Sequence, residues 1–189
     1  MLFALAALIA FGLKSVVAQA FYIPSGSMLP QLQLDDRVVV SKLAYRLHDP
    51  RRGDIVVFDC PESACRDEQR RESSNVVLRL LRSLGEGIGV IQPSTEEFIK
   101  RVVGLPGETV EGRDGRVYVN GRGLIEPYLP RDLRTGDFPP TEVPAGALFV
   151  LGDNRPSSSD SRVFGPIRES SVVGRSIVRV WPLGQASFL

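Results

Sequence analysis

The stretch GDIVVFDC, residues 53–60, is a run of isoleucine, valine and phenylalanine between Gly-Asp and Asp-Cys. Short runs of β-branched and aromatic residues bounded by turn-forming residues predict β-strands. Similar runs recur along the chain, namely DRVVVSKL (36–43), GRVYVNG (115–121), GALFVLGDN (146–154) and GRSIVRVWPL (174–183). Many short strands without helices between them predict a mainly β fold of antiparallel sheets, arranged as a sandwich or barrel.

Two dipeptides support antiparallel hairpins in the second half of the chain. Asp114-Gly115 and Asn120-Gly121 flank the run RVYV at 116–119. Asp-Gly and Asn-Gly are the preferred residues of two-residue hairpin turns, because both turn positions need a positive φ. We therefore expect tight turns on both sides of this strand.

The composition indicates one globular domain and no nucleic-acid partner. The chain has 189 residues, of which 43% are hydrophobic, and its 23 basic and 22 acidic residues nearly cancel. Lysine occurs only at 14, 42 and 100, so the other 20 of the 23 basic residues are arginines. A lysine can lose its proton when it is desolvated, whereas an arginine cannot. Each lysine in this chain is therefore a candidate base.

The first 20 residues are predicted to form a transmembrane anchor. MLFALAALIAFGL is continuously apolar, and the apolar stretch continues past Lys14 to Phe21. Its length approaches the ~20 residues that span a bilayer. A cleaved signal peptide is the alternative, because Ala18 and Ala20 form an Ala-x-Ala pattern. We expect an uncleaved anchor over 1–20 and a β-rich domain over 21–189.

Residues 61–97 are polar and irregular, which predicts an inserted loop. Within it, Val76, Leu80 and Leu84 recur at helical spacing in NVVLRLLRSLG (75–85) and predict a short amphipathic helix. Cys60 and Cys65 are close enough for a small disulfide, and two free thiols are the alternative. No metal site is predicted, because two cysteines and a distant histidine do not complete a zinc ligand set.

The segment FYIPSGSMLP, residues 21–30, offers two serines as nucleophiles. A serine is a weak nucleophile until a neighbouring base takes its proton. The single histidine, His48, lies in a polar turn next to a proline. Lys100 is the stronger candidate because it lies between apolar runs in EEFIKRVVGLPGE (96–108). Lys42, which follows another β run, remains an alternative.

Strand alternation places Phe98, Lys100 and Val102 on one face of a predicted strand. If that face is interior, desolvation disfavours the ammonium form of Lys100, and its amine then accepts a proton near neutral pH. The alternative is a surface lysine with Arg101 pointing inward.

Several segments resemble, in order, the sequence boxes of bacterial type I signal peptidases. They are FYIPSGSMLP (21–30), DDRVVVSKLAYR (35–46), RRGDIVVF (51–58), FIKRVVGLPGETV (98–110) and GDNRPSSSDSR (152–162). The resemblance covers nearly the whole chain outside 61–97. It implies a coiled antiparallel β-sheet domain, like that of signal peptidases and of LexA-like proteins. It also implies a membrane-bound serine endopeptidase with a Ser-Lys dyad and no cofactor.

The resemblance also assigns roles to individual residues. It makes Ser27 the nucleophile and Lys100 the general base. Ser158 would orient the lysine, and Ser25 would join the Ser27 backbone N–H in the oxyanion hole. Two further residues, Asp160 and Arg162, would stabilise the loop around Ser158. The residues implied to line the substrate pocket are Phe21, Ile23, Pro24, Met28, Leu32, Val38 and Ile99, and each is equally compatible with the core.

The chain departs from the family pattern at two places. Asp35-Asp36 stands where the family usually has Gly-Asp, so the turn there is expected to have a different shape. Three consecutive serines at 157–159 leave the register of the last box open, with Ser159 as the alternative to Ser158.

The implied substrates are exported preproteins, cleaved after an Ala-x-Ala-like motif on the outer face of the bacterial cytoplasmic membrane. A single N-terminal span would hold the enzyme in the lipid bilayer. Two alternatives stay open from sequence: a LexA-like protein that cleaves itself with a Ser-Lys pair, and a non-catalytic membrane-tethered β-domain that binds exported proteins.

Overall fold

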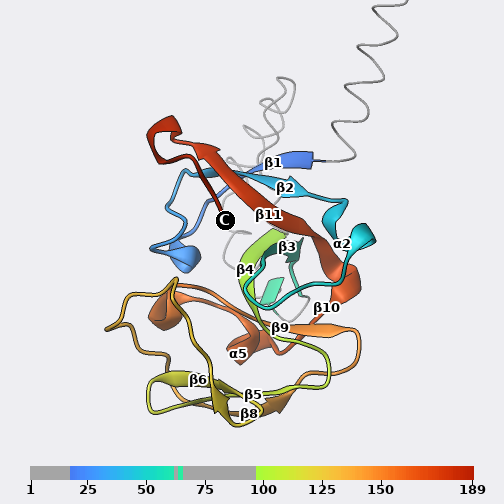
Figure 1. The fold of residues 1–189 in the computed structure, drawn as a ribbon, viewed down its shortest axis with the longest axis vertical. Coiled ribbons are helices and arrows are strands. Elements are labelled where there is room, and N and C mark those ends of the chain that lie inside the picture. Colours follow the sequence, from blue (N-terminus) through green and yellow to red (C-terminus); the bar gives the residue numbers. More distant parts are fainter. Residues whose placement is uncertain (1–17, 62–63, 66–96) are drawn as a thin grey trace, which may run out of the picture.

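The computed structural model describes residues 18–61, 64–65 and 97–189, and these residues form two antiparallel sheets (Figure 1). The larger sheet has the strand order β1-β2-β11-β3-β4-β9-β10, and β12 pairs with β11. The smaller sheet has the order β7-β6-β5-β8. The prediction of a mainly β, antiparallel fold is therefore confirmed.

The strands of the larger sheet are β1 (Ala18–Tyr22), β2 (Arg37–Ser41), β3 (Ile55–Asp59), β4 (Glu97–Gly104), β9 (Ala147–Leu151), β10 (Ile167–Arg168), β11 (Val172–Trp181) and β12 (Ser187–Phe188). Those of the smaller sheet are β5 (Thr109–Arg113), β6 (Arg116–Val119), β7 (Arg122–Gly123) and β8 (Phe138–Glu142). The helical segments are short: α2 (Ala44–Leu47), α5 (Ser161–Phe164), and the 3-10 turns η1 (Gly26–Met28), η2 (Arg155–Ser157), η3 (Glu169–Ser171) and η4 (Leu183–Gln185).

All five apolar runs found in the sequence form strands, and both predicted hairpin turns are present. Asp114 and Gly115 join β5 to β6, with φ angles of 54° and 77°. Asn120 and Gly121 join β6 to β7, with φ angles of 51° and 73°. Both turn positions are left-handed, as the dipeptides predict.

The central strands of the larger sheet are covered on both faces. Ile55 and Val57 of β3 pack in one core cluster, whereas Val56 and Phe58 pack in a second. A strand buried on both faces reads as a continuous apolar run, which is the pattern of IVVF. The neighbouring strand β4 lies between β3 and β9 and is buried in the same way.

Most of the predicted anchor, residues 1–17, lies outside the described residues, and so does the predicted helix at 75–85. Residues 18–20, which the sequence interpretation included in the anchor, form part of β1 and pair with β2. No helix in the described part of the chain is long and apolar enough to cross a bilayer. Cys60 and Cys65 are joined in a disulfide, which answers the question that the sequence left open.

Asp35 explains the departure from Gly-Asp in the turn before β2. Its φ is +68°, in the left-handed region where glycine is favoured and aspartate is tolerated. The Tyr22 hydroxyl donates a hydrogen bond to the Asp35 carboxylate. The turn thus keeps a conformation suited to glycine, with aspartate in its place.

Candidate active site

Ser27 and Lys100 meet in a buried position between η1 and β4. Lys100 Nζ donates a hydrogen bond of 2.9 Å to Ser27 Oγ and another of 2.9 Å to the carbonyl oxygen of Ile99. The exposed fractions of the two residues are 8% for Ser27 and 4% for Lys100. The structure therefore brings together the two residues that the sequence paired across 73 positions.

The position of β4 explains why Lys100 is buried. This strand lies inside the larger sheet, and Lys100 Nζ is 5.2 Å from the centre of the Phe98 ring. Arg101 is buried as well, so the alternative of a surface lysine opposite an inward arginine is wrong. Burial favours the neutral form of an amine, and only that form can accept the proton of a serine hydroxyl.

Ser25 lies immediately before η1 and is exposed. Its Oγ is 3.3 Å from Ser27 Oγ, so the two hydroxyls are direct neighbours. A substrate carbonyl that approached Ser27 Oγ would therefore also approach the Ser25 hydroxyl. A hydroxyl in that place can donate to a developing oxyanion.

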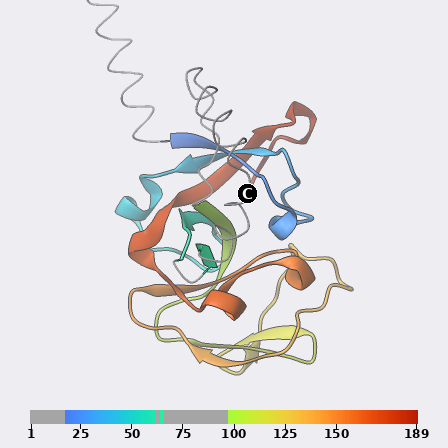
Figure 2. The ribbon, with the colours of Figure 1, turned by 180° about the vertical axis from the view of Figure 1, so that it is seen from behind.

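The loop after β9 packs directly against the turn that holds Ser27. Figures 1 and 2 show η1, in blue, beside η2, in orange, from both sides of the molecule. Asn154 N–H donates to the carbonyl oxygen of Ser27 at 3.0 Å, and Asn154 Nδ2 donates to that of Gly26 at 2.9 Å. Asn154 belongs to the Gly-Asp-Asn segment at 152–154, but no local feature of the sequence indicates this contact.

Gly152 leaves no room for a side chain at this contact. A β-carbon placed on it would lie 2.5 Å from the carbonyl oxygen of Ser27 and 2.6 Å from Ser158 Cβ. Such close approach needs glycine, whose absence of a β-carbon lets two backbones touch.

Ser158 is placed near the dyad without the hydrogen bond that the resemblance implied. Its Oγ is buried and has no hydrogen-bond partner. A β-carbon built on Gly152 would lie closer to Ser158 Oγ than to Ser158 Cβ. The Ser158 hydroxyl therefore points toward the place where Gly152 contacts Ser27. Ser159 is exposed. Of the two serines that the register left open, Ser158 is the one with an inward hydroxyl.

Asp160 and Arg162, to which the resemblance gave a role in this loop, form an ion pair. Arg162 donates from Nε and NH2 to the Asp160 carboxylate, each at 2.8 Å. Asp160 in turn accepts the backbone N–H of Gly152 at 3.0 Å. The ion pair therefore fixes the start of the loop against its end.

A second buried ion pair, which sequence analysis missed, ties β4 to the same loop. Arg101 donates from Nε and NH2 to the Asp153 carboxylate at 2.8 and 2.7 Å. The next arginine of the loop, Arg155, is fully buried and pairs with Glu126, and its NH1 donates to Thr135 Oγ1 at 2.8 Å. The two charged residues that flank Asn154 are therefore held by different segments of the chain. In each contact the two residues are far apart in the sequence, so no local pattern predicts it.

The residues implied to line the substrate pocket have two different environments. Six of them belong to one buried core cluster beside Ser27, and Pro24 is exposed. The buried six are Phe21, Ile23, Met28, Leu32, Val38 and Ile99. In this structure these six side chains are core residues that support the turn under Ser27.

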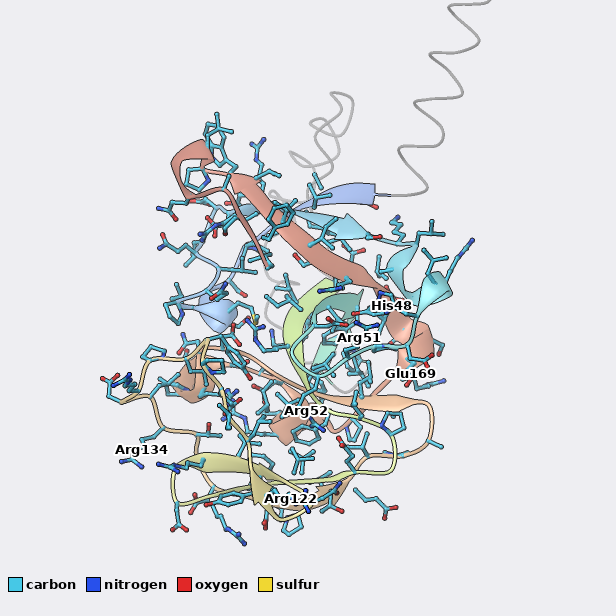
Figure 3. The ribbon with its side chains drawn as sticks, viewed as in Figure 1. His48, Arg51, Arg52, Arg122, Arg134 and Glu169 are labelled. Atoms are coloured by element: carbon cyan, nitrogen blue, oxygen red, sulfur yellow. A yellow bond between two sulfur atoms is a disulfide. The ribbon has the colours of Figure 1, made fainter. Side chains whose placement is uncertain are left out.

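The other candidate bases make different contacts. His48 ends α2, its Nδ1 is 2.9 Å from the carbonyl oxygen of Asp49, and its ring packs edge-on against Tyr45. Figure 3 places His48 on the opposite side of the view from η1. Lys42 directly follows β2 and is half-buried. The base in hydrogen-bond contact with Ser27 is Lys100.

A serine hydroxyl that shares a hydrogen bond with a buried lysine amine defines the class of a candidate serine hydrolase with a lysine base. The comparisons with known proteins name the family. Residues 1–181 match the family model described as signal peptidase, peptidase S26. The chain belongs to this family and is a peptidase.

Individual relatives agree with the family model. The chain is 42% identical to signal peptidase I of Leptolyngbya laminosa over 96% of this chain and 77% of that protein. It is 38% identical to probable signal peptidase I-2 of Synechocystis sp. over 97% of this chain and 72% of that protein. Among solved structures it is similar to a signal peptidase I from Enterococcus faecalis V583. That match has 33% identity and a TM-score of 0.46, and it covers 68% of this chain and 97% of the other.

Proposed function

We propose that this protein is a type I signal peptidase that removes N-terminal signal peptides from exported preproteins after an Ala-x-Ala-like motif. Ser27 is the nucleophile and Lys100 is the general base. The observation that carries this assignment is the 2.9 Å hydrogen bond between Lys100 Nζ and Ser27 Oγ in a buried site. The family match supports a peptidase and gives no support to the alternatives of a LexA-like or non-catalytic protein.

The reaction begins with Lys100 in its neutral form. Its amine takes the proton of Ser27 as Oγ attacks the carbonyl carbon of the scissile peptide bond. The negative charge that develops on the carbonyl oxygen is stabilised by the Ser25 hydroxyl and the Ser27 backbone N–H. Such donors are typically worth ~3 kcal/mol each in the transition state.

Collapse of this intermediate breaks the peptide bond. Lys100 gives its proton to the leaving amine, which becomes the new N-terminus of the mature protein, and the signal peptide stays as an ester on Ser27. Lys100 then takes a proton from a water molecule that attacks the ester. As the ester bond breaks, Lys100 returns this proton to Ser27 Oγ. The signal peptide leaves with a free carboxyl group, and the serine hydroxyl and the neutral lysine are regenerated.

Ser158 is assigned to orient the lysine amine. Its support is a buried hydroxyl without a hydrogen-bond partner. Burying a hydroxyl unpaired is costly, so such a group in a native structure calls for a role. Asp160 and Arg162 hold its loop through their ion pair.

The apolar residues 1–20 are assigned as a single membrane anchor, with the β-rich domain on the outer face of the cytoplasmic membrane. The disulfide between Cys60 and Cys65 supports this location, because disulfides persist in oxidising compartments outside the cytoplasm.

Three variants test the assignment with a purified preprotein as substrate, the shortened product being measured by gel. Ser27→Ala and Lys100→Ala should each abolish cleavage, whereas His48→Ala, which removes the only histidine, should retain most of it. Cleavage by a folded Lys100→Ala protein at the wild-type rate would refute the assignment of the base.

A further inference from the structure

Asn154 makes two hydrogen bonds to the backbone on either side of the nucleophile. Its own N–H donates to the carbonyl oxygen of Ser27 at 3.0 Å, and its side-chain Nδ2 donates to that of Gly26 at 2.9 Å. The carbonyl oxygen of Gly26 also accepts the N–H of Leu29 at 3.2 Å, the bond that closes the 3-10 turn. A residue 128 positions away thus holds the turn that carries Ser27.

The Nδ2 contact has a consequence for the oxyanion hole because peptide groups are planar. The carbonyl of Gly26 and the N–H of Ser27 belong to one trans peptide unit and point in opposite directions. A hydrogen bond that fixes the carbonyl therefore fixes the direction of the N–H. That N–H is the backbone donor that the proposed function assigns to the oxyanion.

The residues next to Asn154 keep it in place. Asp153 accepts two hydrogen bonds from Arg101, which directly follows Lys100 in β4. Arg155 is fully buried and bonds to Thr135 Oγ1 at 2.8 Å and to the carbonyl oxygen of Gly152 at 3.0 Å. The strand that supplies the base and the turn that supplies the nucleophile are therefore both attached to the segment 153–155.

We infer that Asn154 is a positioning residue for signal-peptide cleavage: its side-chain amide sets the peptide plane of Gly26–Ser27 and thereby aims the Ser27 N–H at the oxyanion. This inference rests on the proposed function. The contact requires a donor, because the Gly26 oxygen can only accept. An aspartate at 154 has nearly the same shape, but its ionised carboxylate cannot donate and would repel this oxygen.

The loss of the Asn154 contact should affect kcat and not KM, because the oxyanion exists only during the reaction. The carbonyl oxygen gains its charge only in the transition state, so a misaimed donor lowers kcat and leaves KM nearly unchanged. Complete removal of an oxyanion donor costs about 10²–10³ in kcat. We expect a loss of roughly 10- to 100-fold for Asn154→Ala, in which the donor is present but less well aimed, and a larger loss for Asn154→Asp.

The test compares the full-length wild type in detergent with Asn154→Ala, Asn154→Asp and the control Asn120→Asp. Asn120 lies in a hairpin turn of the smaller sheet, where its Oδ1 accepts the N–H of Thr109 at 2.9 Å. An aspartate there keeps the acceptor, so the control makes the same chemical change without losing a bond. Every variant keeps the backbone N–H of residue 154 that bonds to the Ser27 carbonyl, so the two Asn154 variants change only the side chain.

Four quantities are measured for each protein: kcat and KM on a preprotein, the affinity for a peptide boronate ending in Ala-x-Ala, and the affinity for the matching peptide carboxylate. The boronate forms a tetrahedral adduct when Ser27 Oγ bonds to boron, and one of its oxygens takes the oxyanion position. The carboxylate peptide stands for the product and makes no covalent bond. Boronate affinity should fall by about the same factor as kcat, with carboxylate affinity and KM changed by less than about threefold.

Wild-type values of kcat and boronate affinity in both Asn154 variants would overturn this inference and leave the proposed function intact. So would an equal loss of boronate and carboxylate affinity, or the loss of a cooperative thermal transition in both variants, because each would show a purely structural role. A wild-type protein that neither cleaves the preprotein nor binds the boronate would contradict the proposed function itself.

Discussion

Replacing Gly152 by alanine probes the contact between the loop after β9 and the turn η1, which carries Ser27. The added β-carbon would lie 2.5 Å from the carbonyl oxygen of Ser27 and 2.6 Å from Ser158 Cβ. Ordinary van der Waals contact begins near 3.4 Å, so the neighbours must separate by about 1 Å. Overpacking of this kind costs about 1–3 kcal/mol of stability. A displacement of about 1 Å at a catalytic group costs about 100-fold in rate.

The assay pairs urea unfolding with preprotein cleavage for wild type, Gly152→Ala and the matched control Gly184→Ala. A β-carbon on Gly184 would meet no other atom within 4 Å, so the control should behave as wild type. The double variant Gly152→Ala/Ser158→Ala removes the crowded hydroxyl but keeps the clash with the Ser27 carbonyl. It should therefore recover only part of the lost stability. A Gly152→Ala protein with wild-type stability and rate would refute the packing argument.

Two other changes test the local chemistry of the fold. Asp35→Ala should be less stable than Asp35→Gly by about 1 kcal/mol in urea unfolding. Both variants lose the hydrogen bond from Tyr22, but only alanine is disfavoured at a φ of +68°. Equal stabilities of the two variants would contradict this prediction. Burial, and then the charge and hydrogen bond of Glu126, raise the pKa of Tyr128 above its ordinary value. The unfolded chain therefore releases this proton first as the pH rises above about 10, and the stability that Tyr128 contributes is lost toward its folded pKa. The stability advantage of wild type over Tyr128→Phe should shrink in that range, and a constant difference would show that the group does not titrate.

Four strands of the larger sheet were predictable because their signals are local. Runs of valine and isoleucine between turn residues marked β2, β3, β9 and β11, and two dipeptides marked the hairpins of the smaller sheet. The strand β8 gave no such signal, since it contains Pro139 and Pro140. It is an edge strand of the smaller sheet, and an edge is the position in a sheet where proline is tolerated.

The candidate site was predictable only in part. Ser27 and Lys100 stood out because a serine needs a base and lysines are scarce in this chain. Alternation placed Arg101 opposite Lys100 and so suggested that one of the two was exposed, but β4 is covered on both faces and both are buried. Two other contacts join segments that are far apart in the sequence, and local patterns do not encode them. They are the ion pair of Arg101 with Asp153 and the hydrogen bond from Asn154 to Gly26.

The most direct test of the Ser27–Lys100 dyad is the pH dependence of kcat/KM for wild type and His48→Ala on the same preprotein. A neutral lysine base predicts an ascending limb whose midpoint lies below the ~10.4 of a free lysine, because burial disfavours the ammonium. The limb should have the same midpoint in both proteins, since His48 bonds to its own turn. A flat profile in wild type, or a limb that disappears in folded His48→Ala, would contradict the account.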